Sequence, residues 1–162
     1  MALAMALSAC GEPASNTAAP PAVQSASERV PGFEGIAVVP AEGEVPQVVD
    51  RLTSDINGKG LTLFTTIDHQ ENARAAGLAM RPATVLIFGN PEVGTPIMAA
   101  APTAALDLPQ RMLVFQDVDG ATKIAYNDSR VFARQHGVTG QDEAIDSMIR
   151  ALSGLADAAA KP

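Results

Sequence analysis

Three short apolar runs between residues 80 and 128 constrain the fold of this chain more than any other feature. They cover residues 84–88, 111–115 and 122–126, and each is rich in β-branched or aromatic side chains. Gly-Asn-Pro follows the first run, and the turn from Asp117 to Gly120 separates the other two. Short apolar runs that end at such turn residues are typical of strands, and Asp119-Gly120 predicts a hairpin. This stretch is therefore predicted to form the centre of a sheet.

The segments before this stretch predict two further strands and two helices. Residues 35–39 and 61–67 have the composition of strands. Between them, a helix is predicted to begin near Pro46 and to end near Asn57-Gly58, because apolar residues recur at helical spacing. These residues are Val45, Val48, Val49, Leu52 and Ile56. A short crossover helix is predicted after Asp68, with Gly77 at its end.

The segments around and after the central strands predict further helices. Thr95 is expected to cap a helix with Pro96 in its first turn, and Asp128 or Ser129 to cap another that ends at Gly137. A long helix is predicted after Thr139, and its tail, residues 157–162, is expected to fray. The chain is thus predicted to form a single α+β domain over residues 33–156, with an antiparallel sheet packed by helices.

The N-terminal segment predicts a cellular location rather than a folded structure. Residues 7–10 read Leu-Ser-Ala-Cys, which resembles a bacterial lipobox, so residues 1–10 are interpreted as a lipoprotein-like signal with Cys10 as the lipidated residue. Residues 11–31 lack periodicity and are rich in Ala, Pro and Ser, and are predicted to form a disordered tether. The alternative is an apolar N-terminus with an incidental cysteine. By resemblance to bacterial lipoprotein sorting signals, Gly11 rather than Asp after the cysteine favours the outer membrane, on its periplasmic side.

Composition excludes several classes of function. Eighteen acidic residues against eleven basic ones give a net charge of -7, which opposes the phosphate neutralisation that nucleic-acid binding requires. The lone thiol of Cys10 cannot form an internal disulfide and is too little for a structural zinc site. Met98, Met112 and Met148 lie on apolar faces, so we interpret them as core residues rather than soft-metal ligands. No metal site or cofactor is assigned.

Five polar residues are candidates for ligand binding: Asp68, His69, Asn90, Asn127 and Asp128. Asp68 and His69 combine a carboxylate with an imidazole, as acid–base groups and metal sites do, but a helix cap beside a solvent-facing histidine explains them equally. The other three lie at strand ends, where they either line a polar pocket or satisfy turn backbone. If the later strands form a meander, Asp68 lies at one edge, and Asn90 and Asn127 lie at the other.

The second histidine, His136, precedes Gly137 at a predicted helix C-terminus. A positive imidazolium is favoured there by the helix dipole, so capping is the preferred interpretation of this residue.

A series of short motifs resembles domain-of-unknown-function family 302 over roughly residues 33–155. The motifs are Asp68-His69, Gly89-Asn90-Pro91, residues 94–98, residues 105–109, residues 126–128 and His136-Gly137. The resemblance implies an α+β fold similar to the TATA-box-binding-protein-like class, in the order strand, helix, four strands, helix. It also implies a homodimer. It implies no catalytic residue, because the family has no known function.

These observations lead to three hypotheses about function. The first is a lipid-anchored, non-enzymatic domain of the bacterial envelope that binds a small ligand or a protein partner as a dimer. The second is a hydrolase or isomerase that uses Asp68 and His69. The third is a purely structural envelope protein.

Overall fold

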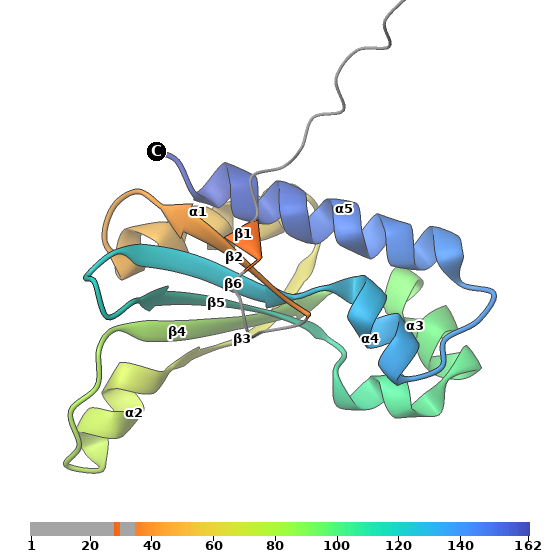
Figure 1. The fold of residues 1–162 in the computed structure, drawn as a ribbon, viewed down its shortest axis with the longest axis horizontal. Coiled ribbons are helices and arrows are strands. Elements are labelled where there is room, and N and C mark those ends of the chain that lie inside the picture. The colour runs from red at the N-terminus through yellow and green to blue at the C-terminus, as the bar shows by residue number, and fades with distance from the viewer. Residues whose placement is uncertain (1–27, 30–34) are drawn as a thin grey trace, which may run out of the picture.

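The computed structural model describes residues 28–29 and 35–162, which form a six-stranded antiparallel sheet with helices on one side and at its ends (Figure 1). Cys10 and most of the predicted tether lie outside the described residues. Glu28 and Arg29, which belong to the predicted tether, form a short strand that pairs with Ala37 and Val38, so the prediction of disorder is wrong for these two residues. The strands are β1 (Glu28–Arg29), β2 (Ile36–Ala41), β3 (Thr62–Asp68), β4 (Ala83–Gly89), β5 (Gln110–Gln116) and β6 (Thr122–Asn127). The helices are α1 (Val45–Gly58), α2 (His69–Ala75), α3 (Pro91–Ala100), η1 (Pro102–Leu106), α4 (Ser129–Gln135) and α5 (Asp142–Ala159).

The strands follow the order β1-β2-β6-β5-β4-β3, so β3 to β6 form a meander and β2 returns beside β6. This confirms the predicted α+β class and the order strand, helix, four strands, helix. The hairpin predicted at Asp119-Gly120 is also present, with Gln116 opposite Thr122 and Gly120 at a φ of 86°. The crossover predicted for α2 is wrong, because β3 and β4 are antiparallel neighbours and α2 lies within their connection.

The main core lies between one face of the sheet and the helices α1 and α5. Its fully buried members include Val48, Leu52, Ile56, Leu86, Phe88, Met112, Val114, Ile124, Leu152 and Leu155. Alternation along the strands brings Leu86, Phe88, Met112, Val114 and Ile124 to one face of the sheet, since successive side chains point to opposite sides. The other five residues lie on the faces of α1 and α5 that pack against it. Burying each such side chain contributes about 1.5–3 kcal/mol. This cluster therefore holds the sheet to its helical layer.

A smaller core joins α3, η1, α4 and α5 at one end of the sheet. It contains Ile97, Ala101, Ala104, Phe132, Ile145 and Met148. Met98 packs against this cluster, while Met148 is buried in it and Met112 in the main core. The interpretation of these methionines as core residues is confirmed.

Two predicted helix starts are wrong. The helix assigned to Thr95-Pro96 begins at Pro91 instead, because the Asn90 side chain caps it and Pro91 supplies a first-turn proline. Pro96 therefore lies inside α3. The long helix begins at Asp142 with Gln141 as its N-cap, so Thr139 belongs to the preceding loop.

The C-terminal segment packs against the domain as far as Ala160, so the prediction that residues 157–162 fray is wrong for residues 157–160. Helix α5 continues to Ala159, and both Ala159 and Ala160 are buried. Arg51 Nε donates a hydrogen bond to the Ala159 carbonyl at 2.9 Å, and Glu42 N donates to the Ala160 carbonyl at 2.8 Å. The small alanine side chains allow the end of α5 to approach the loop that contains Glu42 closely. The alanine-rich composition of this segment therefore favours close packing.

Candidate functional site

Three of the five polar candidates cap helices. The hydrogen bonds are Glu71 N to Asp68 Oδ1 at 2.9 Å, Glu92 N to Asn90 Oδ1 at 2.8 Å, and Arg130 N to Asp128 Oδ1 at 2.8 Å. Each bond satisfies a backbone N–H that has no partner within its own helix. His69 is the half-buried first residue of α2, and Asn127 is the exposed last residue of β6.

The sheet keeps these candidates apart. Asp68 lies opposite Thr84 at one end of the β3–β4 pair, whereas Gly89, next to Asn90, lies opposite Thr62 at the other end. Asn127 lies opposite Ile36 at the same end as Asn90. The separation predicted from a meander is therefore confirmed. Across residues 28–29 and 35–162, no three His, Cys, Asp or Glu side chains are arranged to hold a metal ion.

A row of apolar side chains crosses the sheet on the side opposite α1 and α5. The paired residues are Val38, Ala125, Leu113, Val85 and Ile67, which lie on β2, β6, β5, β4 and β3 respectively. Val39, Ile124, Met112 and Leu86, which neighbour the first four of these residues in the sequence, belong to the main core, so alternation places those four on the other side of the sheet. Ile67 is paired with Val85 and lies on the same side, which we call the open face. All five residues are half-buried. A solvated sheet face is normally polar, so an apolar row there is unusual.

The charged side chains that flank this row are already paired within the chain. Lys123 forms an ion pair with Asp117, and Arg111 Nη2 lies 3.0 Å from Asp107 Oδ1. The hydrogen bond from Lys123 lowers the pKa of Asp117 and raises the pKa of Lys123 itself. The open face therefore presents apolar surface and neutralised charges.

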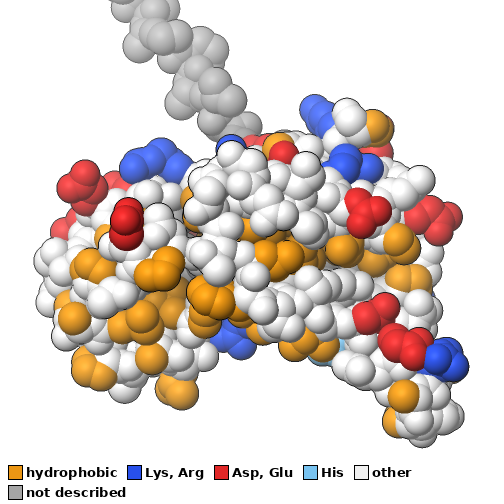
Figure 2. Space-filling model, turned by 180° about the vertical axis from the view of Figure 1, so that it is seen from behind, with side chains coloured by type: hydrophobic (Ala, Val, Ile, Leu, Met, Phe, Trp, Pro, Cys, Tyr) orange, Lys and Arg blue, Asp and Glu red, His pale blue; other side chains and the backbone are white. Residues whose placement is uncertain are grey.

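Apolar side chains also stand at both ends of the open face. Helix α2 and the segment around η1 project on the side of the sheet away from α1 and α5 (Figure 1). Leu78, after α2, is 68% exposed, and Leu106, in η1, is 78% exposed. Seen from behind, the molecule carries hydrophobic side chains along its middle and is hollowed beneath them, between its two projections (Figure 2). The open face is thus the floor of a trough with apolar rims.

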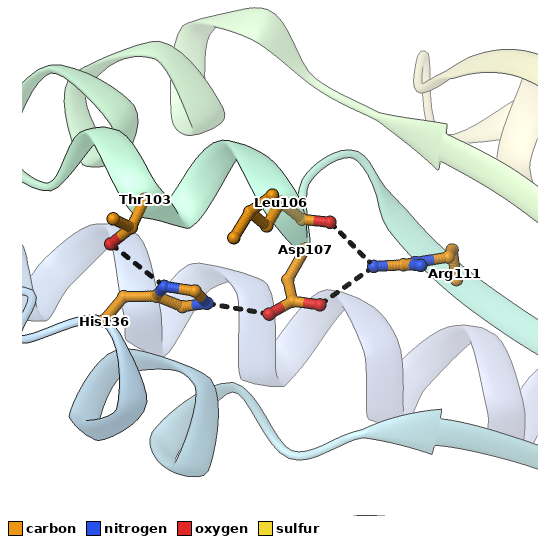
Figure 3. Close-up of polar contacts among 5 residues, drawn as sticks. All are labelled: Thr103, Leu106, Asp107, Arg111 and His136. Atoms are coloured by element: carbon orange, nitrogen blue, oxygen red, sulfur yellow. Dashed lines mark hydrogen bonds and ion pairs between the residues drawn. The ribbon is translucent and has the colours of Figure 1, made fainter.

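A polar cluster around His136 joins η1, α4 and β5 (Figure 3). The His136 ring contacts Thr103 Oγ1 through Nδ1 at 3.1 Å and Asp107 Oδ2 through Nε2 at 2.7 Å. Arg111 donates to the other oxygen of Asp107 and to the Leu106 carbonyl at 3.2 Å. Only 5% of the His136 side chain is exposed. The cluster therefore places a nearly buried imidazole between a hydroxyl and a carboxylate.

The local structure explains how His136 reaches this position. It is the C-cap of α4, with its backbone N–H bonded to the Phe132 carbonyl, and Gly137 follows at a φ of 63°. The predicted helix end is therefore confirmed, but the ring turns to η1 and packs against Phe132 with centroids 5.1 Å apart. Asp107 was missed as its partner, although both residues belong to the motifs that carried the family resemblance.

The series hydroxyl, imidazole and carboxylate contains the residue types of a nucleophilic triad. In this cluster, however, Arg111 neutralises the carboxylate and the ring is almost closed to solvent. Hydrogen bonds of this kind in a low-dielectric setting hold elements in one arrangement. We interpret the cluster as a lock that fixes η1, and with it the Leu106 rim, against α4.

Comparison with known proteins settles the family. The family described as "Domain of unknown function DUF302" matches residues 37–155. The chain belongs to the DUF302 family. A crystal structure of an uncharacterized conserved DUF302 protein from Bacillus stearothermophilus matches with a TM-score of 0.71 and 17% identity, over 78% of this chain and 99% of that chain. This likeness shows that the DUF302 fold is shared.

Curated relatives of this DUF302 chain carry the name of an ion channel. "Fluoride-specific ion channel FluC 1" of Brucella suis biovar 1 is 34% identical over 116 residues, which cover 71% of this chain and 46% of the relative. The protein of the same name from Brucella abortus biovar 1 has the same identity, with 43% of its length covered. The chain thus spans less than half the length of these relatives. Within its described residues, no helix has the length and apolarity to cross a membrane.

Proposed function

We propose that this DUF302 protein is a lipid-anchored, non-enzymatic binding domain of the bacterial envelope that acts as a homodimer through its open face. The observation that carries this proposal is the apolar row from Val38 to Ile67, which crosses five strands. A contiguous apolar surface that is partly exposed and has exposed apolar rims is typical of interaction sites in soluble domains.

The size of the trough supports a stable interface. Five strands spaced by about 4.8 Å, over about 20 Å of strand length, give a floor of roughly 500 Å² in projection. A standard interface buries about 800 Å² per partner. The uneven surface of the side chains and the exposed rim residues Leu78, Met80 and Leu106 supply the difference between these two areas. The open face therefore meets the size that a specific dimer requires.

Charge favours a second copy of the chain as the occupant. A two-fold interface sets the same patch against itself, so unpaired charges on the patch would meet like charges. Arg111 and Lys123 are paired with Asp107 and Asp117 of their own chain, which removes this repulsion. Because Arg111 and Lys123 are already paired, a strongly charged partner would gain less from these two described residues than from free charges.

The N-terminal sequence and the relatives support a place at a membrane. The lipobox-like residues 7–10 precede a segment rich in Ala, Pro and Ser, as in a tethered domain. The relatives named as fluoride channels include a region similar to this one within longer chains. In this proposal, the tether holds the dimer beside the membrane, and the surfaces of the dimer outside the open face recognise its partners.

Light scattering on the 162-residue chain tests this proposal, with Cys10→Ser to prevent lipidation. The wild-type surface should give the mass of a dimer at micromolar concentration. Leu113→Glu should give a monomer, because an unpaired charge at the centre of the row weakens association by about a hundredfold or more. Val118→Glu is the matched control, since Val118 is 79% exposed in the β5–β6 turn, and it should remain a dimer.

Two outcomes would remove the proposed dimer. One is a monomer mass for the unaltered face. The other is a Leu113→Glu variant that keeps its dimer mass and its melting temperature, which would place the interface elsewhere.

A further inference from the structure

A groove between α4 and α5 is separate from the open face. Its volume is 420 Å³, and helix α4, the following loop and the first turns of α5 line it. Its apolar lining includes Ala133, Val138, Ile145 and Ile149. Small-molecule sites commonly have volumes of about 300–1,000 Å³ and mainly apolar walls with a few polar groups. The groove therefore has the dimensions of a site for a small ligand.

The two walls of this groove carry opposite charges. Arg130 and Arg134 line it from α4, and Asp142 and Asp146 line it from α5. All four are exposed, and among the described residues none of them forms an ion pair within 4.0 Å. The arginines of one wall and the aspartates of the other are not joined by ion pairs. The space between them can therefore hold a ligand that carries both a negative and a positive charge.

We propose that this groove binds a small zwitterion with an apolar side chain, of the apolar α-amino-acid class. The ligand carboxylate binds at Arg130 and Arg134, because guanidinium groups match carboxylates in bidentate geometry. The ligand ammonium binds at Asp142 and Asp146. Its side chain lies on the apolar floor around Ile145, which selects against glycine. Thus each chemical part of the ligand has a matching part of the groove.

Isothermal titration calorimetry with leucine, methionine and phenylalanine tests this proposal on the full 162-residue chain. At least one of the three should bind with a Kd below about 10 mM. Glycine lacks the side chain, 4-methylpentanoate lacks the amine and 3-methylbutylamine lacks the carboxylate. Each of these should bind at least about tenfold more weakly, since a charge-assisted contact or a buried side chain is lost.

Variants locate the binding to the groove. Arg134→Gln and Asp146→Asn should each weaken the amino acid by about tenfold, because each removes one partner of a ligand charge. Arg150→Gln is the matched control, since Arg150 is exposed on α5 and does not line the groove. It should bind as the wild type does.

The proposal is overturned if none of the three amino acids binds at about 10 mM. It is also overturned if 4-methylpentanoate binds as tightly as leucine, or if Arg134→Gln weakens binding no more than Arg150→Gln. Because the groove is separate from the open face, Leu113→Glu should leave amino-acid affinity unchanged. Loss of the dimer and loss of ligand binding are thus distinguishable.

Discussion

Replacement of His136 by alanine should destabilise the domain by about 3 kcal/mol. The largest loss is the 2.7 Å hydrogen bond to Asp107, since a bond to a charged group contributes about 1.5–3 kcal/mol, with the lower end apt for a carboxylate that is 30% exposed. The bond to Thr103 contributes about 1 kcal/mol, and the ring contact with Phe132 about 0.5 kcal/mol. For a domain of this size, the melting temperature should fall by roughly 10 °C.

Urea unfolding followed by circular dichroism measures this change, and the other histidine supplies the control. His69→Ala should lie within about 0.5 kcal/mol of the wild type, because no hydrogen bond is made by the half-buried His69 ring in the described structure. A double-mutant cycle of His136→Ala with Asp107→Asn should give a coupling of about 1 kcal/mol or more. Equal stability of the His136→Ala and His69→Ala proteins would refute the interpretation of the cluster as a lock.

Three further predictions concern a cap, an ion pair and the anchor. Asp68→Ala should cost about 0.5–2 kcal/mol in urea unfolding and Asp68→Asn much less, because both Asp and Asn accept the N-cap bond; equal losses would contradict the cap. The depressed pKa of Asp117 stabilises the folded state above the unfolded-state pKa, and this contribution is lost as pH falls through the folded-state pKa. Asp117→Asn should therefore flatten the fall in melting temperature below about pH 4, and an unchanged profile would contradict the pairing with Lys123. Cys10→Ser should release the protein from membranes in fractionation of a host that processes lipoproteins, whereas unchanged membrane association and gel mobility would argue against lipidation.

Much of the fold is predictable because local patterns and burial agree along most of this chain. Helix α1 shows this, since its apolar spacing, Pro46 and Asn57-Gly58 all indicate one helix, and Val48 and Leu52 are fully buried in it. The start of α3 was misplaced because Asn90-Pro91 and Thr95-Pro96 carry the same local cap pattern. Only the tertiary position of the chain after β4 selects the earlier one.

The polar cluster around His136 was less predictable than the fold, because it depends on contacts between residues that are distant in the sequence. Asp68, Asn90 and Asp128 are identifiable as caps, since a cap involves only the next few residues. The contact between His136 and Asp107 joins residues 29 positions apart and depends on how η1 packs on α4. The open face could not be predicted for a different reason. A strand with apolar residues on both sides has the same sequence pattern as a strand that is buried on both sides.

Methyl NMR across a dilution series tests the central claim, that the open face is the dimer interface, most directly. The methyl signals of Val38, Val85 and Leu113 should shift together as the dimer dissociates, because these side chains leave the partner surface. Signals of Val48 and Val118, in the core and in the β5–β6 turn, should stay in place. Dissociation that moves the signals of Val48 or Val118 and leaves Val85 and Leu113 unchanged would contradict the account.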